Sequence, residues 1–169
     1  GSTTPMISNL APGTYTVTVT DSKNCSEIKS VTINPSTLKC TVNIGDYVWL
    51  DEDKDGIQDD SEMGINGIVV HLIELGPDMI LGTGDDVITD TDYTKNNSGK
   101  KGYYYFPDVP KGKYVVMFFI DNNVYAYSPK DQGSNDAKDS DVNPATGKTD
   151  IIMVNPGDPD NLTIDAGVY

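Results

Sequence analysis

The stretch from Asp51 to Glu62 constrains this chain more than any other part of its sequence. Carboxylates occupy its first, third and fifth positions (Asp51, Asp53, Asp55), Gly56 occupies the sixth and Glu62 the twelfth. This is the ligand spacing of an EF-hand calcium loop. Calcium takes about six to eight hard oxygen ligands, and a short segment supplies them only by coiling around the ion, which a glycine at the sharp turn permits.

The spacing assigns each position of the loop a role toward calcium. Three aspartates offer one side-chain oxygen each, the seventh position offers its main-chain carbonyl, the ninth acts directly or through water, and the twelfth offers both carboxylate oxygens. The predicted ligands are therefore Asp51, Asp53, Asp55, Ile57, Asp59 and Glu62. The alternative is a solvated acidic turn that binds no ion.

The segments that flank this loop do not have the pattern of EF-hand helices. Residues 44–50 and residues 68–75 are rich in β-branched and aromatic residues, which is typical of strands. A calcium sensor works by changing the angle between two helices. Because the loop is expected to join two strands, we interpret the calcium as structural rather than regulatory.

The charge of the chain excludes two classes of partner. It contains 26 acidic residues against 12 lysines and arginines, a formal charge of −14. Such an acidic protein is not expected to bind nucleic acid or an anionic membrane. No run of apolar residues is long enough to cross a bilayer, so we expect no membrane insertion. We expect this fragment to be monomeric.

Residues 1–40 are expected to form a unit separate from residues 41–169. Residues 14–20 alternate strictly, with Tyr15, Val17 and Val19 on one face, which predicts a half-buried strand that pairs with residues 28–33. A two-stranded hairpin is only marginally stable alone. This β-hairpin segment is therefore expected to be the end of a larger β unit or to lean on the next domain.

The two cysteines, Cys25 and Cys40, leave their chemical state open. In an extracellular protein the default for two nearby cysteines is a disulfide. Two free thiols are the alternative, and a metal site built from two isolated thiols is less favoured.

The rest of the chain reads as short strands joined by turns. Strands are expected at residues 87–89, 102–106, 113–120, 124–127, 151–154 and 162–169, and residues 90–101 are expected to form a polar loop. The continuous apolar run of residues 113–120 predicts burial on both faces. Many short strands at near-regular spacing predict an all-β Greek-key β-sandwich.

A second acidic stretch covers residues 131–143, and a turn-rich segment with three acids covers residues 76–86. Neither has a regular metal-loop spacing. Each is either a further cation site or a solvated loop, and spacing alone does not decide between them.

Two parts of the chain resemble known families. Residues 7–21, Asn24-Cys25 and residues 30–33 resemble the C-terminal part of SprB-type repeats from large surface adhesins of Bacteroidetes. The main domain resembles the B domains of serine-aspartate repeat adhesins in residues 44–51, in the calcium loop, and in the five segments 64–68, 102–106, 109–114, 136–141 and 162–169.

The second resemblance implies a prealbumin-like, collagen-adhesin B-type sandwich of Ig-like character. It implies that the domain binds more than one Ca²⁺, and we expect one to three ions. By position, the second acidic stretch would contribute Asp136, Asp139 and Asp141. It further implies a role as a rigid spacer in a stalk. The first resemblance implies an extracellular or cell-surface parent protein with many repeats, so that this chain has neighbouring modules.

Two other functions compete with the spacer. A glycan- or protein-binding module could use exposed tyrosines, for which the candidates are Tyr93, Tyr103, Tyr105 and Tyr125. Its ligand would be a host or environmental glycan or protein. Catalysis is not expected, because the acids lie at calcium spacing and His71, the single histidine, lies in a predicted strand with no evident nucleophile partner.

Overall fold

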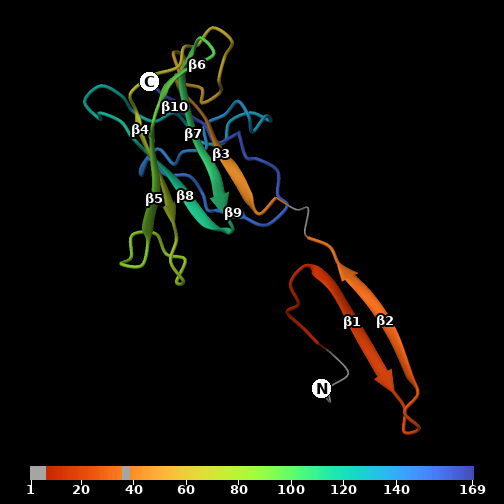
Figure 1. Ribbon diagram of the computed structural model, residues 1–169. Coiled ribbons are helices and arrows are strands. Elements are labelled where there is room, and N and C mark those ends of the chain that lie inside the picture. The colour runs from red at the N-terminus through yellow and green to blue at the C-terminus, as the bar shows by residue number, and fades with distance from the viewer. Residues whose placement is uncertain (1–6, 36–38) are drawn as a thin grey trace. The chain divides into compact units, whose positions relative to one another are not determined.

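A computed structural model describes residues 7–35 and 39–169. The described residues form ten strands in three sheets and contain no helix (Figure 1). The chain divides after residue 38 into two compact units.

The first unit is a β-hairpin of β1 (Gly13–Thr20) and β2 (Ser26–Ile33). The hairpin was predicted, but its half-buried face was not found, since Val17, Val19 and Val31 are 50%, 65% and 60% exposed. The described residues of this unit, 7–35, form one sheet of two strands and no second layer. Cys25 is exposed, and its pairing with Cys40 stays a prediction.

The second unit is a sandwich of two four-stranded sheets. In strand order, one sheet consists of β10 (Ala166–Val168), β3 (Thr41–Leu50), β7 (Lys100–Pro110) and β6 (Lys95–Asn97). The other consists of β5 (Val87–Tyr93), β4 (Val69–Glu74), β8 (Gly112–Phe119) and β9 (Ile152–Val154). Strands far apart in sequence lie side by side, as in β3 with β7 and β4 with β8. The predicted all-β sandwich is confirmed.

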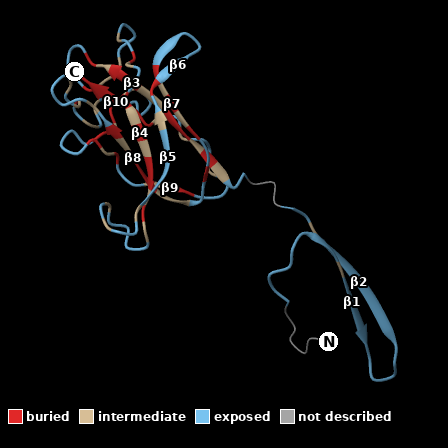
Figure 2. Ribbon diagram, turned by 60° about the vertical axis from the view of Figure 1, so that its left-hand side comes forward, coloured by how far each residue is buried: buried red, intermediate tan, exposed pale blue. Residues whose placement is uncertain are grey.

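The core lies between the two sheets (Figure 2). Alternation along β3 and β7 sends every second side chain inward, so that Ile44, Tyr104 and Phe106 are fully buried. The Tyr104 ring meets Phe118 of the other sheet edge-on at 5.4 Å, and its hydroxyl donates to the carbonyl of Ile164 at 2.7 Å. The predicted two-sided burial of residues 113–120 is confirmed in β8, where three consecutive residues, Tyr114, Val115 and Val116, are buried.

The predicted polar loop at residues 90–101 is wrong, because β5, β6 and the start of β7 cover most of it. β5 is an edge strand, and edge positions accept polar residues that leave no hydrophobic signal. The predicted strand at residues 124–127 is also wrong. The amides of Val124 and Tyr125 both donate to the carbonyl of Asp121, which makes a turn, and only an isolated bridge joins Tyr127 to Val168.

The same kind of turn precedes β1 and β8. The Tyr15 hydroxyl donates to the carbonyl of Ala11 at 2.6 Å, and the Tyr114 hydroxyl donates to that of Pro110 at 3.0 Å. Each tyrosine thus closes the Pro/Gly turn by bonding four residues back. In both segments a proline lies shortly before a glycine and the tyrosine follows that glycine by two positions, so the two turns share the same chemistry.

Candidate metal centre

The loop of residues 51–62 is closed at its base by β3 and β10. The amide of Leu50 donates to the carbonyl of Met63 at 2.9 Å, and the amide of Asp51 donates to the carbonyl of Val168 at 2.8 Å. An isolated bridge joins Trp49 to Gly64. Backbone bonds of a sheet, rather than a pair of helices, therefore hold the two ends of this loop together.

Three of the six predicted ligands converge. One carboxylate oxygen from each of Asp51, Asp53 and Asp55 lies within 4.8 Å of the other two. Asp51 is fully buried, whereas the other two are exposed. We call these three residues the loop cluster.

Backbone amides of the loop hold these carboxylates in place. Asp51 accepts from the amides of Lys54 at 2.7 Å and Gly56 at 3.0 Å. Asp53 accepts from the amide of Asp55 at 3.3 Å, and Asp55 from that of Ile57 at 2.8 Å. Such side-chain bonds to amides a few residues ahead coil the chain tightly around its acidic side chains.

Of the other three predicted ligands, the carboxylates of Asp59 and Glu62 do not belong to this convergent group. Glu62 accepts from the amides of Glu52 at 2.8 Å and Asp59 at 2.9 Å, so its carboxylate lies against the backbone of the loop. Asp59 is exposed, and Ile57 is half-buried and offers a carbonyl.

The second acidic stretch forms its own convergent group. Oxygens of Asp131, Asp139 and Asp141 lie within 4.8 Å of one another, and we call these residues the second cluster. Asp139 is buried and Asp141 is half-buried. Asp131 was not among the predicted ligands. It reaches the cluster because its amide donates to the carbonyl of Ser140 at 2.9 Å, a contact that has no sequence signal.

Asp136, which was predicted as a ligand, lies outside the second cluster. Its carboxylate accepts from the Thr163 hydroxyl at 3.0 Å. It remains close enough to contribute to the raised pKa values of Asp139 and Asp141.

The carboxylates of the second cluster are held in an unfavourable electrostatic environment. The pKa of Asp141 is raised to about 7, mainly because burial removes water from its carboxylate and partly because neighbouring carboxylates are charged. A hydrogen bond from the Asp165 amide at 2.6 Å acts in the opposite direction. Burial also raises the pKa of Asp139, followed by the charges of Asp136 and Asp131. Crowded carboxylates of this kind are stabilised by a cation.

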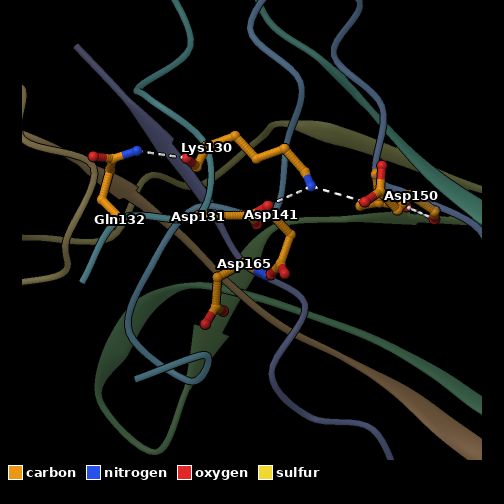
Figure 3. A network of polar contacts seen from close by, with 7 residues as sticks. Lys130, Asp131, Gln132, Asp141, Asp150 and Asp165 are labelled. Carbon is orange, nitrogen blue, oxygen red and sulfur yellow. Dashed lines mark hydrogen bonds and ion pairs between the residues drawn. The ribbon is translucent and has the colours of Figure 1, made fainter. Parts of the chain in front are cut away.

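The ammonium of Lys130 supplies part of this positive charge (Figure 3). The ammonium of Lys130 lies 2.7 Å from Asp131 and 2.9 Å from Asp150, and these bonds raise the pKa of Lys130. The Gln132 side chain donates to the backbone carbonyl of Lys130 at 2.6 Å. One member of the second cluster is therefore paired with a cation of the chain itself.

Asp165 lies behind the second cluster and is 2% exposed. Its Oδ1 has no hydrogen-bond partner among the described residues. Burial, followed by the charges of Asp46 and Asp141, raises its pKa well above the ordinary value. The acidic region thus extends inward from the surface.

The acids of the 76–86 segment bond to their own loop instead. Asp86 accepts from the amides of Gly76 at 3.2 Å and Gly82 at 2.6 Å, and Asp85 accepts from the Thr83 hydroxyl at 2.6 Å. Within residues 7–35 and 39–169, acidic side chains that could hold a metal converge only in the loop cluster and the second cluster. Over the same residues, no helix is long and apolar enough to cross a membrane.

Comparison with known proteins places the main unit in one family. Residues 42–168 match the SdrD B-like domain. The chain is 34% identical over 130 residues to serine-aspartate repeat-containing protein F of Staphylococcus epidermidis, which covers 76% of this chain and 7% of that protein.

Two further relatives have similar coverage. The chain is 37% identical over 132 residues to serine-aspartate repeat-containing protein I of Staphylococcus saprophyticus (76% of this chain, 6% of that protein). It is 36% identical over 138 residues to serine-aspartate repeat-containing protein D of Staphylococcus aureus (82% of this chain, 9% of that protein). The chain thus spans less than a tenth of the length of these relatives.

The resemblance of residues 7–33 to SprB-type repeats lies outside the range 42–168 and stays a prediction. The family is one of adhesin domains and not an enzyme family, and it supports the expected extracellular or cell-surface location. On the match of residues 42–168 and on these relatives, the chain belongs to the SdrD B-like domain family.

Proposed function

We propose that this chain is a calcium-stabilised spacer module of a large cell-surface adhesin, one that stiffens a stalk between neighbouring modules. Its ions, one to three in number, would bind at the loop cluster and the second cluster. The carbonyl of Ile57 and the carboxylates of Asp59 and Glu62 would complete the first shell.

The observation that carries the proposal is the way the two acidic stretches are joined. The amide of Gln58 donates to the carbonyl of Lys138 at 2.6 Å, and the amide of Ser140 donates to the carbonyl of Gly56 at 3.1 Å. Cations here would neutralise carboxylates on two segments far apart in sequence and hold those segments together.

The position of the loop supports a mechanical role. Its base is bonded to β3 and β10, which are neighbours in one sheet of the sandwich. An ion in the loop would therefore stiffen the end of that sheet directly. At a calcium concentration about 100 times the dissociation constant, one site contributes roughly 2.7 kcal/mol by mass action, a large part of the stability of a small domain.

Thermal unfolding with calcium and with a chelator tests the proposal. We expect a large rise in the melting temperature with calcium, mostly lost in the Asp53→Asn, Asp55→Asn double variant. Both residues are exposed, so the substitutions disturb little packing. The matched control, Glu52→Gln with Asp90→Asn, removes the same charge at exposed positions outside the predicted ligand set and should keep the rise. Equal melting temperatures in calcium and in chelator would exclude the proposal.

A further inference from the structure

Three tyrosines form a row on the outer face of the sheet that contains β3 and β7. In the antiparallel pairing of β3 with β7, Tyr47 lies opposite Tyr103, and Gly45 lies opposite Tyr105. Directly paired residues share a face of the sheet, as do residues two apart on a strand. Tyr47, Tyr103 and Tyr105 therefore share one face, and we call them the tyrosine strip.

The strip faces away from the core. Tyr104 and Phe106 alternate with the strip residues of β7 and are fully buried, whereas all three strip tyrosines are half-buried. The rings of Tyr103 and Tyr105 lie nearly parallel, with centroids 6.4 Å apart and planes inclined by 17°. Gly45 has no side chain to cover the surface opposite Tyr105. The result is a half-exposed row of aromatic side chains on this face of the sheet.

A cleft of about 850 Å³ lies at one end of this strip. Tyr47 and Tyr103 belong to its lining. One wall is the end of the 51–62 loop with residues up to Gly64, and the other is the turn between β6 and β7, residues 97–101.

Backbone contacts hold the two walls in position. A Cβ at Gly64 would lie 1.8 Å from the carbonyl oxygen of Lys101, so the two walls meet in backbone contact. Asn66 accepts from the amide of Gly102 at 2.8 Å and donates to Asn96 at 2.7 Å. The cleft therefore exists in the free protein and needs no rearrangement to form.

The lining of the cleft selects among ligand classes. Acidic side chains and lysines both line the cleft. The acids are Asp46, Asp59, Asp60 and Glu62, and the lysines are Lys100, Lys101 and Lys138. Neither sign dominates, so a ligand of strong net charge has no advantage. Met63 is the single aliphatic side chain of the lining, so the cleft has no apolar pocket for a peptide anchor. Gln58, Asn97 and Ser98 add neutral hydrogen-bonding groups.

We propose that the cleft and the tyrosine strip bind a neutral oligosaccharide. Sugar hydroxyls donate to carboxylates and accept from ammonium and amide groups, and the apolar face of a pyranose ring packs on an aromatic ring. The cleft takes one or two sugar units, and the chain continues along Tyr103 and Tyr105. This inference goes beyond the spacer role, with which it shares Asp59 and Glu62, so that Asp46 and Asp60 are the carboxylates left for sugar hydroxyls when calcium is bound.

The other two tyrosines considered from sequence do not take part. Tyr93 ends β5 of the opposite sheet and is 57% exposed, and Tyr125 lies in the turn after Asp121. Tyr47, which the sequence did not single out, replaces them because register with β7 brings it beside Tyr103. Tyr93 is therefore a matched control for the strip.

The test is a titration of the isotope-labelled chain, saturated with calcium, with maltotriose, cellotriose, chitotriose and mannotriose, monitored by amide chemical shifts. We expect at least one sugar to shift residues 97–103 together with residues near Tyr47. Tyr103→Ala should weaken that binding roughly tenfold, as expected for loss of one stacked ring. Tyr93→Ala should leave the affinity unchanged. Lys100→Ala, at an exposed position of the rim, provides a second variant should Tyr103→Ala unfold.

Several outcomes would overturn the inference. Each of three results would refute the oligosaccharide site: none of the four sugars binds, Tyr93→Ala weakens binding as much as Tyr103→Ala, or the shifts are confined to the sheet that contains β4 and β5. Tryptic peptides of serum albumin are titrated in parallel. Peptide binding at the strip without sugar binding would assign this surface to peptide recognition and refute the oligosaccharide. The melting temperature of each variant with calcium separates these results from a failure of the spacer proposal.

Discussion

Ile57 forms an antiparallel β-bridge with Asp139, which sets the middle of the 51–62 loop beside the second cluster. A Cβ at Gly56, the residue before Ile57, would meet the carbonyl of Pro129, which lies two residues before the second acidic stretch. The two acidic stretches are therefore in direct backbone contact. A substitution that shifts the loop should also disturb the cluster built on residues 131–141.

Gly56→Ala should disturb both clusters although Gly56 supplies no carboxylate. Gly56 has φ +80°, and a Cβ there would lie 2.3 Å from the carbonyl oxygen of Pro129. The left-handed backbone costs about 1 kcal/mol, and the clash adds about 1 to 3 kcal/mol. We expect a lower melting temperature and weaker calcium binding in isothermal titration.

Gly67→Ala is the control for this substitution. Gly67 has φ +88°, but its added Cβ meets nothing within 4 Å. It therefore carries the backbone cost without the clash. Equal losses of stability and calcium affinity in the two variants would show that contact with Pro129 does not couple the stretches.

Lys130→Met should make the second cluster more dependent on calcium. The ammonium that lies 2.7 Å from Asp131 offsets carboxylate repulsion, so its removal should lower metal-free stability by about 1 kcal/mol. The same ammonium competes with a bound cation, so the rise in melting temperature on adding calcium should exceed that of the parent chain. Lys138→Met is the control, because Lys138 pairs with Asp60, an exposed residue outside the cluster. A smaller calcium response in Lys130→Met would contradict this role.

Asp92→Asn should reduce stability at neutral pH more than at acid pH. Burial raises the pKa of Asp92, but bonds from Lys95 at 2.7 Å and from the amide of Tyr105 at 2.9 Å outweigh it, so the pKa lies below its ordinary value. A lowered carboxyl pKa stabilises the fold above the unfolded-state pKa, and this contribution is lost as pH falls through the folded-state pKa. We expect a loss of about 1 kcal/mol near pH 7 that fades at acid pH, as the pH falls through the lowered pKa of Asp92.

Urea unfolding at the two pH values measures this effect. Asp90→Asn on the same strand is the control, because Asp90 is exposed and, among the residues that the structure describes, its side chain accepts a bond only from the adjacent Thr91 amide. A loss in Asp92→Asn that grows toward acid pH would refute the assigned pKa direction.

Tyr114→Phe should destabilise the main unit by about 1 kcal/mol, the net contribution of one hydrogen bond. Its ring is fully buried and its hydroxyl closes the turn that begins β8, so only the bond to Pro110 is lost. Urea unfolding monitored by fluorescence of the buried Trp49 reports on this unit. Tyr105→Phe, at a half-buried outer position, should change stability by much less. Equal losses of stability in the two variants would show that the hydrogen bond from Tyr114 to Pro110 does not stabilise the fold.

Much of the fold was predictable because strands carry a pattern in their own residues. Alternation predicted β1, β-branched and aromatic residues predicted β3 and β4, and a continuous apolar run predicted β8. The sequence predicted only residues 87–89 of the edge strand β5. Its remaining residues form a strand because they pair with β4, and Asp90 and Asp92 give this part no hydrophobic pattern. The half-burial expected of β1 failed because alternation shows which face is apolar, not whether another layer covers it.

The sequence by itself determined the loop cluster, because its three carboxylates and its glycine are contiguous and local turn geometry brings them together. Only the tertiary structure decided that Asp131 joins Asp139 and Asp141 while Asp136 lies outside, and that Tyr47 lies beside Tyr103. These relationships depend on backbone bonds and strand register between segments distant in the chain. Spacing along the sequence carries no information about which distant segments meet, so those contacts appear only once the sandwich has formed.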